Sequence, residues 1–283
     1  MKSDTDWTLD VKPQSKGIDL NMKELWRYKD LLFLLVKRDF VSVYKQTILG
    51  PFWFFVQPII TSLTFTIIFG RIAGLGSDGI PSMLFYLSGL TLWTYFSDCL
   101  NKTSGTFISN ASIFGKVYFP RLIIPLSVLI SNLIKLAIQL VLFLVVWVYY
   151  LITQDVVHPH YELIIVFPLL VIIMALMGMG IGILISSLTT KYRDLTFLVG
   201  FGVQLIMYLS PIIYPMSKVE GKFKLLIMAN PITHVIEAFK YIFLGTGSLN
   251  WLYLGYSFLF MLVILFIGVF SFGKVEKNFM DTV

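Results

Sequence analysis

The sequence predicts an all-α membrane protein with six transmembrane helices. Of its 283 residues 57% are apolar and 13% charged, whereas soluble domains have about 45–50% and 25%. The apolar residues are grouped into six runs, each long enough for a helix of roughly 20 residues that crosses a bilayer. The runs are 49–69, 83–100, 122–152, 163–188, 195–214 and 251–272. We therefore expect residues 47–283 to form one six-span membrane domain.

The segment before the first run divides into two parts. Residues 1–20 are polar without periodicity, which is typical of a flexible lead-in, here on the cytoplasmic side. In residues 21–46, Leu25, Tyr28 and Leu32 recur at helical spacing among basic residues, which predicts an amphipathic helix at the membrane surface. A solvent-exposed helix is the alternative, but six consecutive apolar residues at 31–36 favour the membrane.

The basic residues indicate how the chain is oriented. Short loops rich in Lys and Arg stay on the cytoplasmic side, and most of the 22 such residues fall in cytoplasmic segments if both termini lie inside. We expect a bacterial inner-membrane protein with both termini cytoplasmic and in contact with membrane lipids. The net charge of +6 is spread over several loops rather than clustered, so nucleic acid is not an expected partner.

The first run is interrupted by two prolines, in Gly50-Pro51 and Gln57-Pro58. Proline removes a backbone hydrogen bond and bends a helix, which is tolerated where the helix faces protein or a cavity. The four aromatic residues at 52–55 have two interpretations. They belong either to the aromatic belt of a membrane interface or to a stacking surface for sugar rings.

The third run is longer than one crossing needs and carries a polar stripe. Its 31 residues would reach about 46 Å, so its start should project into the cytoplasm. The polar residues recur every three or four positions on one face: Ser127, Ser131, Asn132, Lys135 and Gln139. Lys135 serves either as contact between helices or in a transport pathway.

Small residues in the fourth run indicate close helix packing. Gly178, Gly182 and Ser186 are spaced by four, with Gly180 between them, and such residues let helix backbones approach. A nucleotide-binding glycine loop would need a preceding strand and another spacing.

Residues 215–248, between the fifth and sixth runs, predict two short re-entrant helices on the external side. The apolar pieces 223–228 and 232–244 are too short to cross a bilayer. Asn230-Pro231 between them supplies a helix N-cap followed by proline at the first helical position.

The chain lacks the residues of an energy-coupling or catalytic site. No glycine-rich phosphate-binding loop occurs, and Asp98 is the only carboxylate in the runs, so a proton relay is not expected. We find neither paired carboxylates nor a metal triad, which a membrane-embedded enzyme would need. We therefore expect no cofactor or metal on this chain and a separate subunit as the source of energy.

Six short motifs occur in a fixed order around the apolar runs. They are Lys37-Arg38-Asp39, Leu49-Gly50-Pro51, Lys116-Val117-Tyr118-Phe119-Pro120-Arg121, Tyr192-Arg193-Asp194, Ser210-Pro211-Ile212-Ile213-Tyr214 and Asn230-Pro231. In this order they resemble one family, the permease subunits of type-2 ABC exporters of bacterial polysaccharides such as O-antigen, capsule and teichoic acid. The resemblance covers about residues 20–277.

The resemblance implies a homodimer with two copies of an ATPase subunit, which would bind ATP and Mg and drive export of a lipid-linked polysaccharide, with O-antigen favoured. It implies a coupling helix that docks on the ATPase through Ile113, Phe114, Val117, Tyr118, Phe119 and Arg121. It implies a glycan channel lined by Trp53, Gln57, Gln204, Tyr208 and Tyr214. The implied external gate contains Asn230, Pro231, His234 and Glu237, of which we expect His234 and Glu237 to face the pore axis or each other. Two alternatives remain: an exporter of a drug or small lipid, and a membrane-embedded enzyme.

Overall fold

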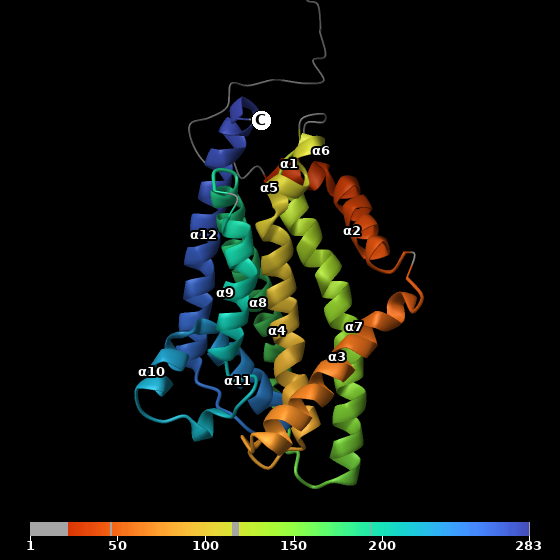
Figure 1. The fold of residues 1–283 in the computed structure, drawn as a ribbon, viewed down its shortest axis with the longest axis vertical. Coiled ribbons are helices and arrows are strands. Elements are labelled where there is room, and N and C mark those ends of the chain that lie inside the picture. Colours follow the sequence, from red (N-terminus) through yellow and green to blue (C-terminus); the bar gives the residue numbers. More distant parts are fainter. Residues whose placement is uncertain (1–21, 46, 115–118, 193, 283) are drawn as a thin grey trace, which may run out of the picture.

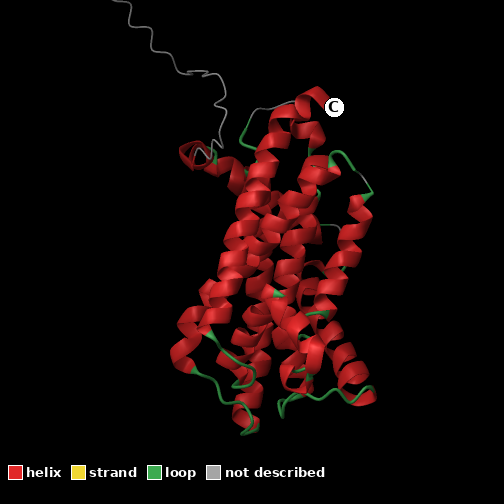
Figure 2. Ribbon diagram, turned by 90° about the vertical axis from the view of Figure 1, so that its left-hand side faces the viewer, coloured by secondary structure: helices red, strands yellow, loops and turns green. Residues whose placement is uncertain are grey.

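The computed structural model describes residues 22–45, 47–114, 119–192 and 194–282, and within them all regular elements are helical (Figures 1 and 2). The α-helices are α1 (Met22–Arg27), α2 (Lys29–Tyr44), α3 (Trp53–Phe65), α4 (Ser82–Ser104), α5 (Thr106–Ser109), α6 (Ala111–Phe114), α7 (Ile123–Thr153), α8 (Phe167–Thr189), α9 (Leu195–Tyr208), α10 (Gly221–Ala229), α11 (Pro231–Leu244) and α12 (Trp251–Thr282). Short 3-10 or π segments are η1 (Gly50–Phe52), η2 (Thr66–Ile72), η3 (Tyr161–Val166) and η4 (Met216–Lys218).

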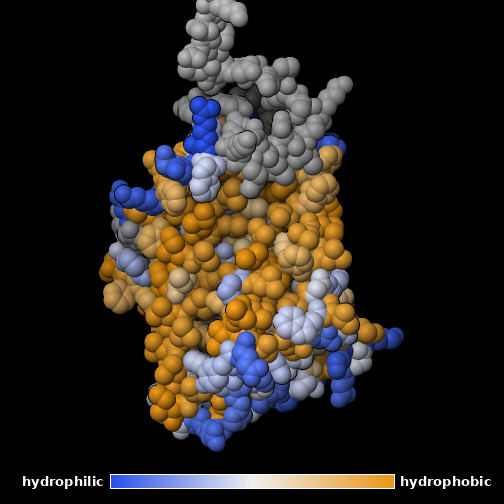
Figure 3. Space-filling view, turned by 180° about the vertical axis from the view of Figure 1, so that it is seen from behind, coloured by the Kyte–Doolittle hydropathy of each residue, from blue (hydrophilic) through white to orange (hydrophobic). Residues whose placement is uncertain are grey.

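The long helices form a bundle along the longest axis of the molecule. Figure 1 shows α4, α7, α8, α9 and α12 running between an upper end, with α1, α5, α6 and the C-terminus, and a lower end, with α10 and α11. The surface is apolar over most of its height, and hydrophilic residues gather toward the two ends (Figure 3). This is the surface that a bilayer requires of a protein that spans it.

Four helical segments are both long and apolar enough to cross a membrane: Gly50–Ile72, Ile123–Thr153, Tyr161–Thr189 and Trp251–Val275. The other two expected spans fall short for different reasons. Helix α4 is long enough, at ~35 Å, but its sequence is less apolar because it lies inside the bundle, packed on α3, α7, α8 and α11. Helix α9 stops at Tyr208, six residues before the end of its apolar run, and the chain then turns at Ser210-Pro211.

Glycines bring α8 into close contact with the helices on both sides. A Cβ atom on Gly178 would lie 2.8 Å from the carbonyl oxygen of Phe96 in α4, and one on Gly180 would lie 2.9 Å from the backbone nitrogen of Leu265 in α12. Neither contact leaves room for a side chain. The predicted close packing is therefore confirmed, with two partners instead of one.

Helix α3 and η2 form one bent segment that crosses the bundle at a slant (Figure 1). Pro58 lies inside α3, where it removes one backbone donor and bends the helix. The last turns widen into the π-helical η2. Much of the segment's surface is exposed in the single chain.

The amphipathic segment is divided at Tyr28 into α1 and α2, because the backbone of Tyr28 (φ −95°, ψ 21°) leaves the helical region. Leu35 and Val36 of α2 are buried, and the helix packs on α7. Phe33 and Leu34 remain exposed. The helix thus has one apolar side for the bundle and another that a membrane surface would cover.

Candidate functional site

Polar side chains meet at three successive levels between α4 and α7, which run antiparallel. Nearest the upper end, Nζ of Lys102 donates to Oδ1 of Asn132 at 2.8 Å. At the next level Nζ of Lys135 lies 2.6 Å from Oδ2 of Asp98. At the third level Thr94 and Gln139 line a common cavity. We refer to this set as the polar ladder: Thr94, Asp98, Lys102, Asn132, Lys135 and Gln139.

The ion pair explains how two charged groups lie within the bundle. The side chains of Lys135 and Asp98 are 17% and 25% exposed, and charges at membrane depth usually pair or face water. The polar stripe containing Lys135 was found from the sequence, but its pairing with Asp98 was missed. A signal was present, because each is the only charged residue of its apolar run, the two signs are opposite, and the runs are consecutive.

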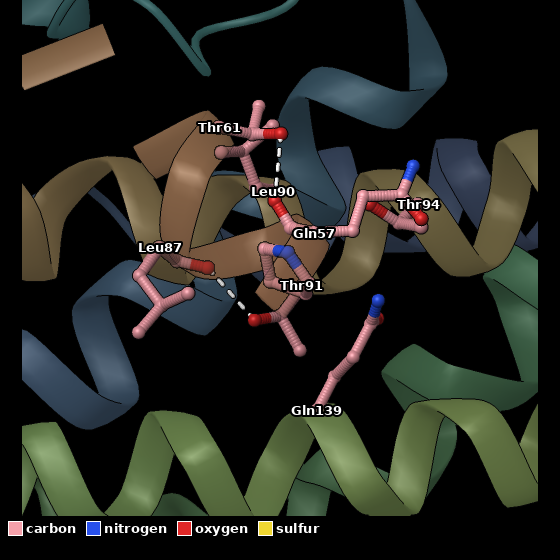
Figure 4. A pocket seen from close by; sticks show the side chains of 8 residues that line it. Gln57, Thr61, Leu87, Leu90, Thr91, Thr94 and Gln139 are labelled. Atoms are coloured by element: carbon pink, nitrogen blue, oxygen red, sulfur yellow. Dashed lines mark hydrogen bonds between the residues drawn. The ribbon is translucent and has the colours of Figure 1, made fainter. Parts of the chain in front are cut away.

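The cavity at the third level has a volume of about 40 Å³ and lies between α3, α4 and α7. Figure 4 shows the side chain of Gln139 rising from α7 toward Gln57 and Thr94. The hydroxyl groups of Thr61 and Thr91 donate to backbone carbonyl groups of their own helices. Gln139 is 4% exposed, and among the residues that the structure describes none forms a hydrogen bond with its amide.

The residues expected in the glycan channel form two groups. Trp53 and Gln57 are exposed on α3, which packs on α4 and α7. Gln204 and Tyr208 are exposed on α9, which packs on α4 and α8. Nε2 of Gln204 donates to the Tyr208 hydroxyl at 3.2 Å, and the Tyr214 hydroxyl donates to the carbonyl oxygen of Tyr208 at 2.9 Å. One chain therefore presents two separate faces, on either flank of α4.

The expected ATPase-docking residues are mostly turned inward. Phe114 and Phe119 are buried with their ring centroids 5.8 Å apart, and the guanidinium of the buried Arg121 lies 5.1 Å from the Phe114 centroid. Ile113 is partly buried. Val117 and Tyr118 lie outside the described residues.

Phe114, Phe119 and Arg121 thus contact their own chain, and the docking role expected of them stays a prediction. The residues that are exposed nearby at the upper end are Ile108, with 44% of its surface exposed, Ser109 and Ser112. The exposure of Ile108 was not predicted from the sequence, because a four-residue helix has too few turns to define its outer face.

Asn230 joins three elements at the lower end. Its Oδ1 accepts from the backbone nitrogen of Ile232 at 3.1 Å, which is the predicted N-cap of α11 with Pro231 at the first position. Its Nδ2 donates to the carbonyl oxygen of Leu209 at 3.1 Å and to the Ser210 hydroxyl at 2.9 Å. The end of α9 is therefore tied to the start of α11.

The polar residues of α11 are buried within the chain. Nε2 of His234 lies 2.8 Å from the carbonyl oxygen of Met228, and its ring stacks on Tyr253 at 4.9 Å between centroids. Burial lowers the pKa of His234 and raises the pKa of Glu237, for which nearby Lys240 acts in the opposite sense. His234 and Glu237 are thus shielded from lipid by their own chain.

Lys240 is the residue of α11 that sequence reasoning missed. It is 1% exposed, its Nζ donates to the carbonyl oxygen of Pro211, and it lies 3.6 Å from the ring centroid of Phe85 in α4. Burial lowers its pKa to about 8, against the opposing effect of Glu237. The cation holds the turn after α9 against α4.

The described residues contain no group of three or more His, Cys, Asp or Glu side chains that could hold a metal ion. The polar features of the described residues are the polar ladder, the neutral cavity and the exposed side chains of α3 and α9.

Comparison with known proteins places the chain among transporters. The O-antigen export system permease protein RfbA of Klebsiella pneumoniae is 28% identical over 254 residues, which cover 89% of this chain and 94% of that protein. The RfbA protein of Myxococcus xanthus is 26% identical over 224 residues, 78% and 83% of the two chains. The polysialic acid transport protein KpsM of Escherichia coli is 25% identical over 233 residues, 81% and 87%. The family model of the ABC-2 type transporter matches residues 30–244, and the chain belongs to this family.

Proposed function

We propose that this chain is the membrane subunit of an ATP-driven exporter that moves a lipid-linked polysaccharide across the bacterial inner membrane, through a channel at a homodimer interface. The observation that carries the proposal is the pair of exposed faces on α3 and α9, which combine aromatic rings with amides. Aromatic planes stack on the C–H faces of sugars, and amides bond their hydroxyl groups. Relatives named for O-antigen export and polysialic acid transport favour a glycan, with O-antigen first.

The proposed topology has six spans, with α4 and α9 completing the four apolar ones. Helix α4 can cross without an apolar surface because its neighbours, rather than lipid, surround it. The excess of Lys and Arg in the segments that would lie inside favours cytoplasmic termini, and the upper end, where the C-terminal helix α12 ends, would then face the cytoplasm. Helices α10 and α11 then enter and leave the outer leaflet as a re-entrant pair.

The channel requires a second copy of the chain. In one chain Trp53 and Gln57 face outward on α3, and Gln204 and Tyr208 do so on α9. Amides facing lipid would be costly, since nothing there satisfies their hydrogen bonds. A homodimer in which these faces enclose a common space would give them water or sugar as partners. A drug or lipid exporter would have no need of such amides.

The energy comes from two copies of an ATPase subunit that bind ATP and Mg, because this sequence has no phosphate-binding loop. We place the docking surface around Ile108, Ser109 and Ser112, with Val117 and Tyr118 as further candidates. The buried rings of Phe114 and Phe119 would then carry the force into the bundle instead of contacting the ATPase.

The external gate would use α10 rather than α11 as its moving part. Helix α11 is fixed through Asn230 and Lys240, and His234 and Glu237 lie in its buried base. Helix α10 is exposed over most of its nine residues. Pro231 marks the boundary between the fixed and the exposed helix.

The function is tested by deleting the gene in its own bacterium. We expect surface polysaccharide to be lost, lipid-linked glycan to accumulate inside, and the wild-type chain to restore export when its ATPase is present. The purified chain alone should hydrolyse no ATP. Unchanged surface glycan, or a defect confined to drug resistance, would overturn the proposal.

Docking is tested in the same strain. Ile108→Asp should reduce co-purification of the ATPase, because a charge would replace an apolar contact. Ile72→Asp, at an exposed isoleucine of the lower end, is the control and should leave co-purification unchanged. Equal behaviour of the two variants would show that the ATPase docks elsewhere.

A further inference from the structure

The cavity between α3, α4 and α7 contains hydrogen-bonding groups that the protein does not use. At the two upper levels of the polar ladder the side chains satisfy one another, as Lys102 does with Asn132 and Lys135 with Asp98. At the third level Gln139 points into the cavity (Figure 4). Within the described part of the chain its amide has no hydrogen-bond partner.

The amide of Gln139 is free to bind a molecule in the cavity. Gln139 lies near the middle of α7, far from both ends of the bundle, and among the described residues its amide is not one of the enclosed side-chain groups without a partner, so the cavity gives it access to water or a ligand. The amide of Gln57 reaches the same cavity from α3, also without a side-chain hydrogen bond to any described residue. Two amides from different helices therefore converge on one space.

The lining indicates the chemistry of the occupant. Amides and threonine hydroxyl groups supply neutral donors and acceptors, while Pro58, Leu87 and Leu90 supply an apolar wall. The nearest charges, those of Asp98 and Lys135, neutralise each other. A phosphate or another ion would find no free opposite charge there, whereas a neutral polyhydroxyl compound would find both hydrogen bonds and apolar contact.

The size of the cavity limits which part of a polyhydroxyl compound can enter it. A water molecule needs roughly 10–15 Å³ of such space, so about 40 Å³ admits a hydroxymethyl group or neighbouring hydroxyl groups but not a whole sugar ring. Gln57 lines the cavity and is itself exposed, and its side chain also belongs to the proposed channel face. We propose that this cavity is a binding subsite beside the channel. There Gln57 and Gln139 bind hydroxyl groups of the passing saccharide, whose ring approaches the cavity with its edge. The inference rests on the proposed function.

Occupancy is tested by cysteine protection in whole cells that contain the complete transporter. Thr94→Cys is introduced with Cys99→Ser, and the rate of reaction with a small water-soluble methanethiosulfonate is compared with glycan synthesis running and blocked. We expect labelling when synthesis is blocked and severalfold slower labelling while glycan passes. Equal rates in the two states would mean that the cavity holds water alone, and no labelling in either state would mean that it is closed. Both outcomes overturn the inference.

The role of the amide is tested with Gln139→Leu, which keeps the side-chain size and removes the hydrogen bonds. Surface glycan should fall about fivefold, the effect of one lost hydrogen bond, with unchanged amounts of assembled complex. Gln154→Leu, at the exposed lower end of α7, is the control and should export normally. Normal export by the Gln139 variant would overturn the subsite. If the wild-type chain itself exports no glycan, the proposed function fails instead, which keeps the two failures distinct.

Discussion

The ion pair between Asp98 and Lys135 makes a quantitative prediction about the stability of the bundle. Breaking a fully buried pair costs about 3–5 kcal/mol, and an exposed pair contributes about 0–1 kcal/mol. At 2.6 Å, with side chains 17% and 25% exposed, this pair lies between the two cases. We expect Lys135→Met to lower the free energy of unfolding by about 2 kcal/mol, because it leaves the carboxylate of Asp98 without its partner.

A double-mutant cycle separates the pairing from the loss of either side chain. Asp98→Asn combined with Lys135→Met removes both charges, so the double variant should be more stable than the sum of the single effects by about 1–2 kcal/mol. Unfolding is followed by circular dichroism in detergent micelles titrated with a denaturing detergent. The control combines Lys135→Met with Asp155→Asn, an exposed residue beyond the lower end of α7, and should be additive. Additivity in both cycles would refute the pairing.

Two further substitutions test the packing and the lower end. Gly182→Ala should lower the free energy of unfolding by about 1–3 kcal/mol, because the added Cβ would lie 2.8 Å from the carbonyl oxygen of Leu100. The control is Gly200→Ala, whose Cβ meets no atom within 4 Å. It should be neutral or stabilising in the same assay. Equal free energies of unfolding for the two variants would contradict the close contact. Asn230→Ala should cost about 1–2 kcal/mol through the lost cap, and Asn230→Asp, which keeps the acceptor but not the donor to Leu209, should lie between it and the wild type. An alanine variant as stable as the wild type would show that the hydrogen bonds of Asn230 between the end of α9 and the start of α11 do not stabilise the fold.

The sequence contained most of the information for the start of α11 and for the packing of α8. Asn230-Pro231 predicted the start of α11 because an N-cap side chain and a proline act within one turn of the residues they affect. The glycines of α8 predicted close contact because their effect depends only on the absence of a side chain. Local physical causes of this kind need no knowledge of the fold.

The burial of the residues around Phe114 could not be predicted in the same way. Phe114 and Phe119 form an apolar side of a short segment, and an apolar side is equally suited to the chain's own core or to a partner. Which of the two covers it depends on helices far away in the sequence. Phe114 packs on Phe107 with 6.0 Å between the ring centroids, and Phe107 in turn stacks on Phe272 of α12 at 4.4 Å. Ile108 is left outside by the same packing, and its exposure follows only from the assembled bundle.

Helix α4 shows how a helix of sufficient length can lie within a membrane protein without being strongly apolar. A helix that faces lipid must be apolar, but one surrounded by other helices can carry Asp98, Lys102 and several hydroxyl groups, provided that its neighbours supply partners. The polar residues that lower its hydropathy are those that pair with α7 and line the cavity. Low hydropathy in a run of sufficient length is therefore expected of the innermost helix of a transporter, and two consecutive runs that each hold a single charge of opposite sign identify the pair of helices between which a polar pathway can exist.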